Sequence, residues 1–598
     1  MLNYQKRYLE NTTRIASLSD IFAVVPNDFD AWYETVKTSR DTIEKLREEN
    51  MDLLNTYFFP TLDDIFNSTE EERRHLEEFG DKLMDWSINL DIGIYVLIHE
   101  TLLNMYRYLK DRNNIIKELY KLGMGLYYLN SMVKGIEGRQ VDALYFEDEL
   151  LFTEAASYLK YFAEIDDEET KGYIIRALAN ISIASKDHKK KVEASSKAIR
   201  IIKDSYYRDL APGLPWDTYL RRAYQQMSAN RYTLDRGDLS TKQLMEIMEA
   251  CQIIFEPEQG VSDPNIRWLW PYYEMEYNCG LADLNLTMSR METLISEAIP
   301  DRYDDSGTYA NVQLPIYYGR MIRNNIQLRD RHHLTFLDHA YRRMMNYILT
   351  YPQEKINGAF YYTLTLIVSD YYECDQVMSY KEVSTKMMRR FIGFEYIKSQ
   401  KISSLLKCCC GYIFDCDERF FDDIPFIYEI KDREEKRKAL ISYNEDCGLY
   451  FDYGLLKMHI ERTRFTRDFF EREYEIYKLH TLSAYIDLKE RESTKIFADI
   501  CLGHHRWYNG HDGYPDEYVR SDSPYRQMCD LLSVVIWLNS NYHGDIKECI
   551  ERIGRYEGRR FSPLISDFFR DEKLQKELTA ILDKDEEVYY RELFTQIK

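Results

Sequence analysis

Proline and glycine are scarce along this chain. Only 14 prolines and 24 glycines interrupt its 598 residues, and the long windows between them repeat apolar residues at i, i+3, i+4 and i+7. This spacing is the period of an amphipathic α-helix. The apolar run at residues 92–98 could form a strand, but it lies within a longer helix-compatible run, residues 79–109. The sequence therefore predicts an all-α protein that is helical at 92–98 as well.

The pattern of helices suggests a division into three regions. Between about residues 145 and 299 the expected helices come in blocks, 147–165, 168–185, 189–210, 216–234 and 241–255, which is the spacing of stacked helical hairpins. Segments 154–163 and 173–180 resemble a tetratricopeptide-type helix pair. Residues 256–260 and 300–307 are rich in turn-forming and acidic residues and are the candidate linkers. We expect an N-terminal helical region at 1–140, a helical-hairpin region at 141–330, and a third domain at 331–598.

Composition excludes several classes of function. The 79 lysines and arginines against 101 aspartates and glutamates give a net charge of -22, which disfavours binding of nucleic-acid polymers. No window reaches the roughly 20 apolar residues of a membrane span, and the first 16 residues lack the apolar core of a signal peptide. The 11 cysteines include no C-x-x-C pair, so neither a zinc ribbon nor structural disulfides are expected. We expect a cytoplasmic protein without membrane contact.

Histidine gathers in the last quarter of the chain. His504 and His505 each continue a line of apolar residues four positions apart, and His480 and Asp530 do the same in their own helices. One buried histidine is more often a hydrogen-bonded core residue, but three helices that point polar groups at one core favour a metal site. Asp530 needs a cationic partner because a buried carboxylate is costly without one. Half of the 12 histidines follow residue 450, namely His459, His480, His504, His505, His511 and His543.

Residues 504–515, HHRWYNGHDGYP, resemble the loop that gives the HD-GYP phosphohydrolases their name. Upstream, residues 447–456, CGLYFDYGLL, resemble the family's apolar helix that ends in His-Asp-x-Gly-Lys. Downstream, SPYRQMCD at 523–530 resembles its last ligand helix, and GRRFSP at 558–563 its closing turn. The resemblance covers about residues 445–569, the core of the third domain, with its motifs in the family's order.

The resemblance implies an enzyme that opens a cyclic dinucleotide, such as cyclic di-GMP, in bacterial signalling. It implies one or two divalent metal ions, and imidazole and carboxylate ligands suit iron, manganese, nickel or zinc. Asp452 would be catalytic. Gly513, Tyr514 and Pro515 would shape the substrate loop. The implied metal ligands are Asp452, His480, His504, His505 and Asp530.

Two departures from the family pattern leave activity open. Phe451 replaces the first histidine of the His-Asp pair, and Leu455 replaces the lysine that faces substrate phosphate. Ligands expected from an upstream helix are also unassigned, because residues 403–450 contain no histidine. The alternative function is an inactive HD-GYP-like receptor or scaffold. In either case the N-terminal helices are expected to bind a protein partner. The residues left as unassigned candidates are Asp415, Glu445, His332, His333 and His339.

Overall fold

The protein is all-α, as the sequence predicts. The computed structural model describes residues 1–22, 27–85, 88–131, 133, 139–230, 239–255, 266–298, 310–352, 358–458 and 463–597. Within these ranges the only strands are a pair of two-residue segments, and no helix is both long and apolar enough to cross a membrane. The predicted linkers at 256–260 and 300–307, and His459, lie outside the described residues.

The chain forms two compact units. The N-terminal unit contains Met1–Ile15, Lys45–Tyr372 and Thr466–Asp468, and the C-terminal unit contains Ala16–Glu44, Glu373–Phe465 and Phe469–Lys598. The main division therefore falls after Tyr372, further along the chain than the expected boundary near residue 330. Helix α2 (Phe29–Leu53) contributes residues to both units.

The N-terminal unit holds most of the chain's helices and its two strands. Its elements are α1 (Asn3–Leu18), α3 (Phe59–Asp63), α4 (Glu70–Leu83), β1 (Met84–Asp85), β2 (Ile88–Asn89), α5 (Ile92–Leu109), α6 (Arg112–Ser131), α7 (Arg139–Ser157), α8 (Glu168–Ala184), α9 (His188–Lys203), α10 (Ser205–Asp209), α11 (Trp216–Ala229), α12 (Thr241–Phe255), α13 (Ile266–Asn278), α14 (Leu284–Ala298), α15 (Ala310–Asn324), α16 (Arg331–Leu349) and α17 (Gly358–Asp370).

The C-terminal unit is built from shorter helices around the long α19. Its elements are α18 (Tyr380–Phe391), α19 (Gly393–Cys416), α20 (Pro425–Tyr428), α21 (Arg433–Tyr450), α22 (Glu471–Lys478), α23 (His480–Lys489), α24 (Ala498–Gly503), α25 (Arg526–Asn541), α26 (Ile546–Arg555), α27 (Pro563–Phe569), α28 (Glu572–Leu582) and α29 (Glu587–Ile597).

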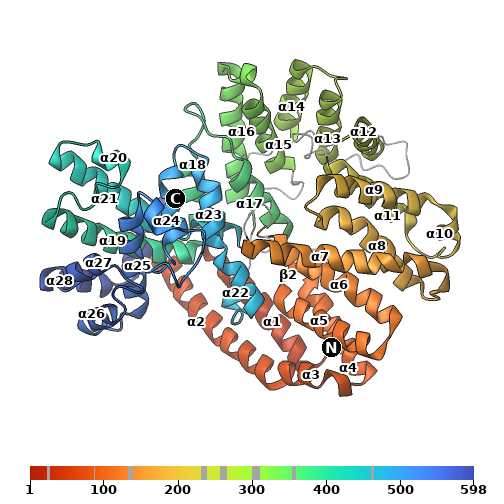
Figure 1. The fold of residues 1–598 in the computed structure, drawn as a ribbon, viewed down its shortest axis with the longest axis horizontal. Coiled ribbons are helices and arrows are strands. Elements are labelled where there is room, and N and C mark those ends of the chain that lie inside the picture. The colour runs from red at the N-terminus through yellow and green to blue at the C-terminus, as the bar shows by residue number, and fades with distance from the viewer. Residues whose placement is uncertain are drawn as a thin grey trace. The chain divides into compact units, whose positions relative to one another are not determined.

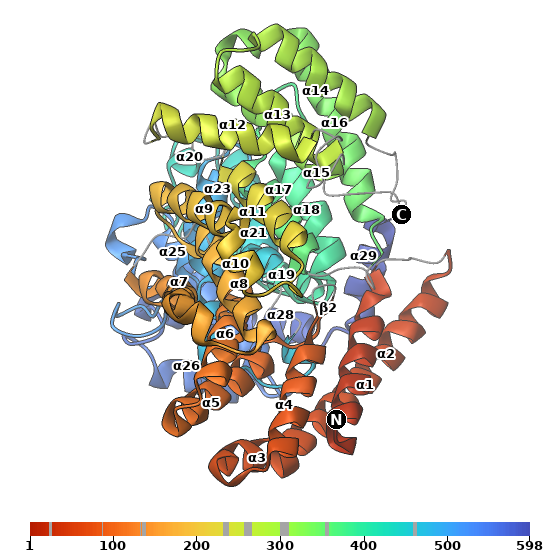
Figure 2. The same cartoon turned by 90° about the vertical axis from the view of Figure 1, so that its right-hand side faces the viewer.

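Successive helices of the N-terminal unit pack on their neighbours. Helices α5 to α9 form a series in which each contacts the next, and α6 also contacts α8 (Figure 1). Helix α11 packs on both α9 and α12, and α9 and α11 lie side by side in the rotated view as well (Figure 2). The expected helices at 168–185 and 241–255 agree closely with α8 and α12. The helices thus stack in sequence order, and the tetratricopeptide-like character stays a prediction.

The helix-compatible run at 79–109 is interrupted. Helix α4 ends at Leu83, and β1 pairs antiparallel with β2, Met84 opposite Asn89. Helix α5 then begins after Asp91, whose carboxylate accepts a hydrogen bond from the backbone N–H of Ile94 (3.0 Å). Aspartate is a favoured N-cap because its oxygen accepts from an N–H that has no partner within the helix. The helix predicted at 92–98 is therefore confirmed, within a shorter element.

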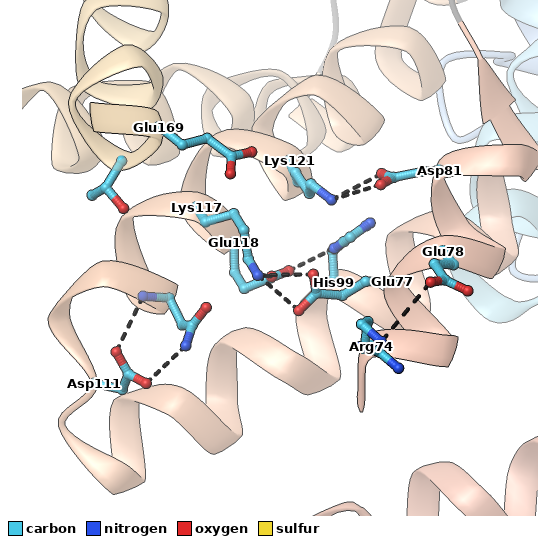
Figure 3. A network of polar contacts seen from close by, with 12 residues as sticks. Arg74, Glu77, Glu78, Asp81, His99, Asp111, Lys117, Glu118, Lys121 and Glu169 are labelled. Atoms are coloured by element: carbon cyan, nitrogen blue, oxygen red, sulfur yellow. Dashed lines mark hydrogen bonds and ion pairs between the residues drawn. The ribbon is translucent and has the colours of Figure 1, made fainter. Parts of the chain in front are cut away.

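A buried polar network joins α4, α5 and α6 in the N-terminal unit (Figure 3). His99 Nδ1 lies 2.5 Å from Glu118 Oε2, and neither side chain is exposed to solvent. Lys117 Nζ lies 2.8 Å from both carboxylate oxygens of Glu77 and 3.7 Å from Glu118 Oε1. A buried carboxylate is costly unless paired, so Glu118 depends on His99 and Lys117.

We predict that Glu118→Ala lowers the free energy of unfolding by about 3 kcal/mol, because it leaves buried donors without their acceptor. Urea denaturation followed by circular dichroism measures this change. Glu78→Ala is the matched control on α4, since Glu78 is half-exposed and pairs at the surface with the N-terminal ammonium of Met1 (2.9 Å) and with Arg74 (4.0 Å). It should cost less than about 1 kcal/mol. Equal losses in the two variants would contradict the role assigned to burial.

Candidate metal centre

Four predicted ligand residues meet in the C-terminal unit. Asp452 follows the end of α21 and precedes a 3-10 helix, Tyr453–Lys457. His480 is the first residue of α23, and His504 and His505 directly follow α24. One ligand atom from each of these four side chains lies within 4.8 Å of the others. Three of the residues are buried and His505 is half-buried. Ends of three helical segments thus bring one carboxylate and three imidazoles together.

Backbone hydrogen bonds fix the orientation of two imidazoles. His480 Nδ1 lies 2.7 Å from the Tyr477 carbonyl oxygen, and His504 Nδ1 lies 2.8 Å from that of Cys501. A carbonyl only accepts, so each Nδ1 carries a proton, and in a neutral ring the Nε2 then presents a lone pair. The two Nε2 atoms are 3.4 Å apart, and each is 3.6 Å from Asp452 Oδ1. Two imidazole nitrogens and a carboxylate oxygen therefore converge on one point.

At neutral pH, His480 and His505 are held in the neutral form and Asp452 in the ionised form. Burial lowers the pKa of His480 to about 4 and lowers the pKa of His505 well below its usual range. Burial acts to raise the pKa of Asp452, but His504 and the Lys398 ammonium hold it below its ordinary value. Convergent lone pairs and a carboxylate repel one another unless a cation lies between them. Neutral imidazoles held through Nδ1, with a carboxylate, fit a divalent transition metal.

The Gly-Tyr-Pro loop folds back onto the histidine pair. Gly513 has φ +76°, and a Cβ there would lie 2.2 Å from the His505 carbonyl oxygen. The Tyr514 N–H donates to that same oxygen (3.3 Å), and the Tyr514 ring centroid lies 4.5 Å from that of His505. Pro515 follows through a cis peptide bond and is buried. Arg506 donates to the carbonyl of Gly513 (3.1 Å). The loop thus covers His505 with an aromatic ring.

Asp530 lies elsewhere than predicted. Its carboxylate accepts from Arg520 Nε (3.1 Å to Oδ1) and Arg520 Nη2 (2.5 Å to Oδ2), and it is not among the four clustered residues. Helical spacing correctly predicted that the Asp530 side chain points inward. Asp530 also has a cationic partner, as the burial of a carboxylate requires. That cation is an arginine from the turn before α25 rather than a metal. The structure thus provides a partner that explains the burial of Asp530 without a metal.

The two departures from the family pattern are both buried. The Phe451 ring packs edge-on against His504, with centroids 5.4 Å apart, so an apolar ring stands where the family has a histidine. Leu455 is also buried. The unassigned candidates are not in the cluster. Glu445 pairs with Lys407, Asp415 pairs with Arg437, and His339 is exposed. His332 and His333 group with Glu292 in the N-terminal unit.

Helix α19 adds two charged residues that the sequence reasoning missed. Lys398 Nζ lies 3.9 Å from Asp452 Oδ2 and 3.6 Å from Glu395 Oε2. Glu395 in turn contacts the Arg464 guanidinium. The available signal was the pair Glu395 and Lys398, three residues apart on one helix. Such a pair is common on exposed helix faces, so its sequence alone does not place it beside Asp452.

No protein-family model and no curated protein matches this chain. The functional assignment therefore rests on the fold and the site. Together they define an all-α protein with a buried cluster of one aspartate and three histidines, suited to a divalent metal.

Gly454 positions His480. A Cβ at residue 454 would lie 1.9 Å from the His480 carbonyl oxygen and 2.7 Å from its carbonyl carbon. We predict that Gly454→Ala displaces the start of α23, lowers bound metal per chain, and destabilises the protein by about 1–3 kcal/mol. Gly411→Ala in α19 is the control, because its Cβ would come no closer than 3.4 Å to any described atom. Elemental analysis and urea denaturation of both variants test this, and full metal content in Gly454→Ala would refute it.

Metal-free protein should lose stability on mild acidification. His480 faces Asp452, His504 and Lys398, and its folded pKa of about 4 lies below the value of about 6.5 for an unfolded histidine. Between these values the unfolded chain binds a proton that the folded protein does not, so stability falls as pH falls. We expect about 2 kcal/mol less stability at pH 5 than at pH 7 from this residue. Urea denaturation after chelation measures it.

The matched variants for this measurement are His480→Gln and His543→Gln. The first removes the buried titrating group and should flatten the dependence on pH. The second changes an exposed histidine and should leave the dependence as in the wild type. A pH dependence that is the same in all three proteins would contradict the assignment to His480.

Proposed function

We propose that the C-terminal unit is an HD-GYP-like metal-dependent phosphohydrolase that acts on a cyclic dinucleotide. The observation that carries the proposal is the convergence of His480 Nε2, His504 Nε2 and Asp452 Oδ1 among buried side chains. Each ring already uses its Nδ1 on a backbone carbonyl, so both Nε2 atoms are turned toward the carboxylate, as in a set of metal ligands. The sequence of the loop at 504–515 supports the choice of this family.

Asp452, His480, His504 and His505 would hold the metal. A divalent ion there would supply Lewis-acid activation of water and stabilise charge on a phosphodiester. The chain's own groups orient the ligands: the carbonyls of Tyr477 and Cys501 fix the rings of His480 and His504. Four protein ligands suit a single ion better than two: Arg520 binds Asp530, which leaves four of the five ligands implied by the sequence, and Phe451 stands where the family has a further histidine.

The Gly-Tyr-Pro loop would keep water away from the proposed metal site. Tyr514 covers His505 on one side, and Arg506 holds the loop through the carbonyls of Gly510 and Gly513 and the carboxylate of Asp516. Water-poor surroundings strengthen the interaction of a bound cation with an anionic substrate. A flat tyrosine ring beside the metal ligands also offers a surface for a nucleobase.

One observation favours the alternative, a receptor that binds a metal or nucleotide without turnover. Phe451 and Leu455 replace a ligand and a phosphate-facing cation, and both are packed into the core. The N-terminal helices, in either case, are proposed to bind a protein partner.

The deciding experiment measures metal content and hydrolysis on the same samples. Wild type purified without chelator should carry about one manganese, iron, nickel or zinc ion per chain. Asp452→Asn and the double variant His504→Ala, His505→Ala should lose most of it, together with any hydrolysis of cyclic di-GMP. The matched control is the double variant His339→Ala, His543→Ala, which removes two exposed histidines that belong to no cluster of potential ligand atoms among the described residues. It should keep both metal and activity.

The outcomes separate the two functions. Metal with turnover, lost only in the C-terminal variants, supports the phosphohydrolase. Metal without turnover supports the receptor. Metal absent from the wild type, or lost equally from the control, would remove the ligand assignment.

A further inference from the structure

Lys398 is a cation with unused hydrogen-bonding capacity beside the metal centre. Its ammonium lies 3.6 Å from Glu395 Oε2 and 3.9 Å from Asp452 Oδ2, and it makes no hydrogen bond to any residue that the structure describes. An ammonium has three N–H donors. The side chain is 37% exposed, so a molecule from solvent can reach it.

The two carboxylates near Lys398 have other cations to neutralise them. Glu395 contacts the guanidinium of Arg464, which burial places in a dry environment. Asp452 is a proposed metal ligand, and a bound ion would take up its negative charge. With metal in place, Lys398 therefore remains as a positive charge whose donors point to no acceptor within hydrogen-bonding distance among the described residues. In a chain of net charge -22, a partly exposed cation with free donors beside a bound metal ion would attract an anion.

We propose that Lys398 binds a phosphate oxygen of the substrate, which makes the ligand of this centre a phosphate ester. This inference rests on the proposed function. Residue 455, where the family resemblance places a phosphate-facing lysine, is a buried leucine and cannot serve. The Lys398 ammonium, which comes from α19 of the same unit, lies 3.9 Å from Asp452 and could take the place of that lysine. Charge-assisted hydrogen bonds to phosphate are among the strongest polar contacts available to a lysine.

The test uses inorganic phosphate as the probe and full-length protein loaded with Mn²⁺. Isothermal titration calorimetry gives the phosphate Kd, and elemental analysis gives the metal content of the same sample. We expect Lys398→Ala to weaken phosphate binding by about tenfold or more at unchanged metal content. Lys398→Arg should restore binding to within about threefold of wild type, because it keeps the charge and the donors. In the hydrolysis assay Lys398→Ala should raise KM for cyclic di-GMP more than it lowers kcat.

Lys407→Ala is the matched control. Lys407 is on the same helix and also pairs with a carboxylate, that of Glu445, but it is not part of the metal centre. It should leave phosphate binding unchanged. The inference is overturned if Lys398→Ala binds phosphate like wild type, if Lys407→Ala weakens it equally, or if metal-loaded wild type binds no phosphate. It is also overturned if Lys398→Ala loses the metal, since Lys398 would then support the centre itself.

Failure of the role of Lys398 and failure of the metal centre give different results in this experiment. Metal-loaded wild type with an unaffected Lys398→Ala variant contradicts only the role of Lys398 and leaves the metal centre standing. Wild type that holds no metal contradicts the proposed function, and the role of Lys398 falls with it.

Discussion

The close approach of two imidazole nitrogens and a carboxylate oxygen is the constraint that most distinguishes the C-terminal unit. Two imidazole nitrogens 3.4 Å apart, each 3.6 Å from a carboxylate oxygen, are unfavourable neighbours in a water-poor core. The surrounding backbone prevents their escape. Carbonyl groups hold both rings from behind, and Gly454 packs against the backbone of His480 so closely that no side chain fits between them. The folded chain therefore maintains an arrangement that a cation would relieve.

In the N-terminal unit, by contrast, a buried carboxylate is paired with other side chains of the protein. Glu118 is fully enclosed, but its Oε2 lies 2.5 Å from His99 Nδ1, and the Lys117 ammonium lies 3.7 Å from its Oε1. Asp530 in the C-terminal unit is hydrogen-bonded more completely, since two nitrogens of Arg520 donate to its carboxylate. Among these buried carboxylates, Asp452 differs because its nearest nitrogens, on His480 and His504, lie 3.6 Å away, beyond hydrogen-bonding distance. This contrast is what singles out the cluster as a site rather than a structural network.

Much of the fold and most of the cluster could be predicted from periodicity. The 3.6-residue period predicted the bounds of α8 and α12 closely, and the i, i+4 spacing predicted correctly that His480 and His504 point inward.

Periodicity does not predict which residue will pair with an inward-pointing group. Arg520 reaches Asp530 from a short 3-10 helix, Arg520–Asp522, and the position of such a short element is set by tertiary packing. Lys398 and Glu395 were missed for a related reason, because which face of α19 meets the 3-10 helix after α21 depends on helix packing. The break before α5 was readable, since Asp91 is a favourable N-cap.

Arg506 contacts the loop on both sides of its tip and donates no hydrogen bond to the side chains at the tip itself. The guanidinium reaches the carbonyls of Gly510 and Gly513 and the carboxylate of Asp516, so these contacts hold the stretch that bears Tyr514 without using the side chains of residues 511 and 512. His511 and Asp512 are exposed and lie outside the cluster of ligand atoms. This turn is thus a natural graft point: substituted residues or a reporter peptide introduced at 511–512 would be displayed beside the metal centre while the histidine pair keeps its support.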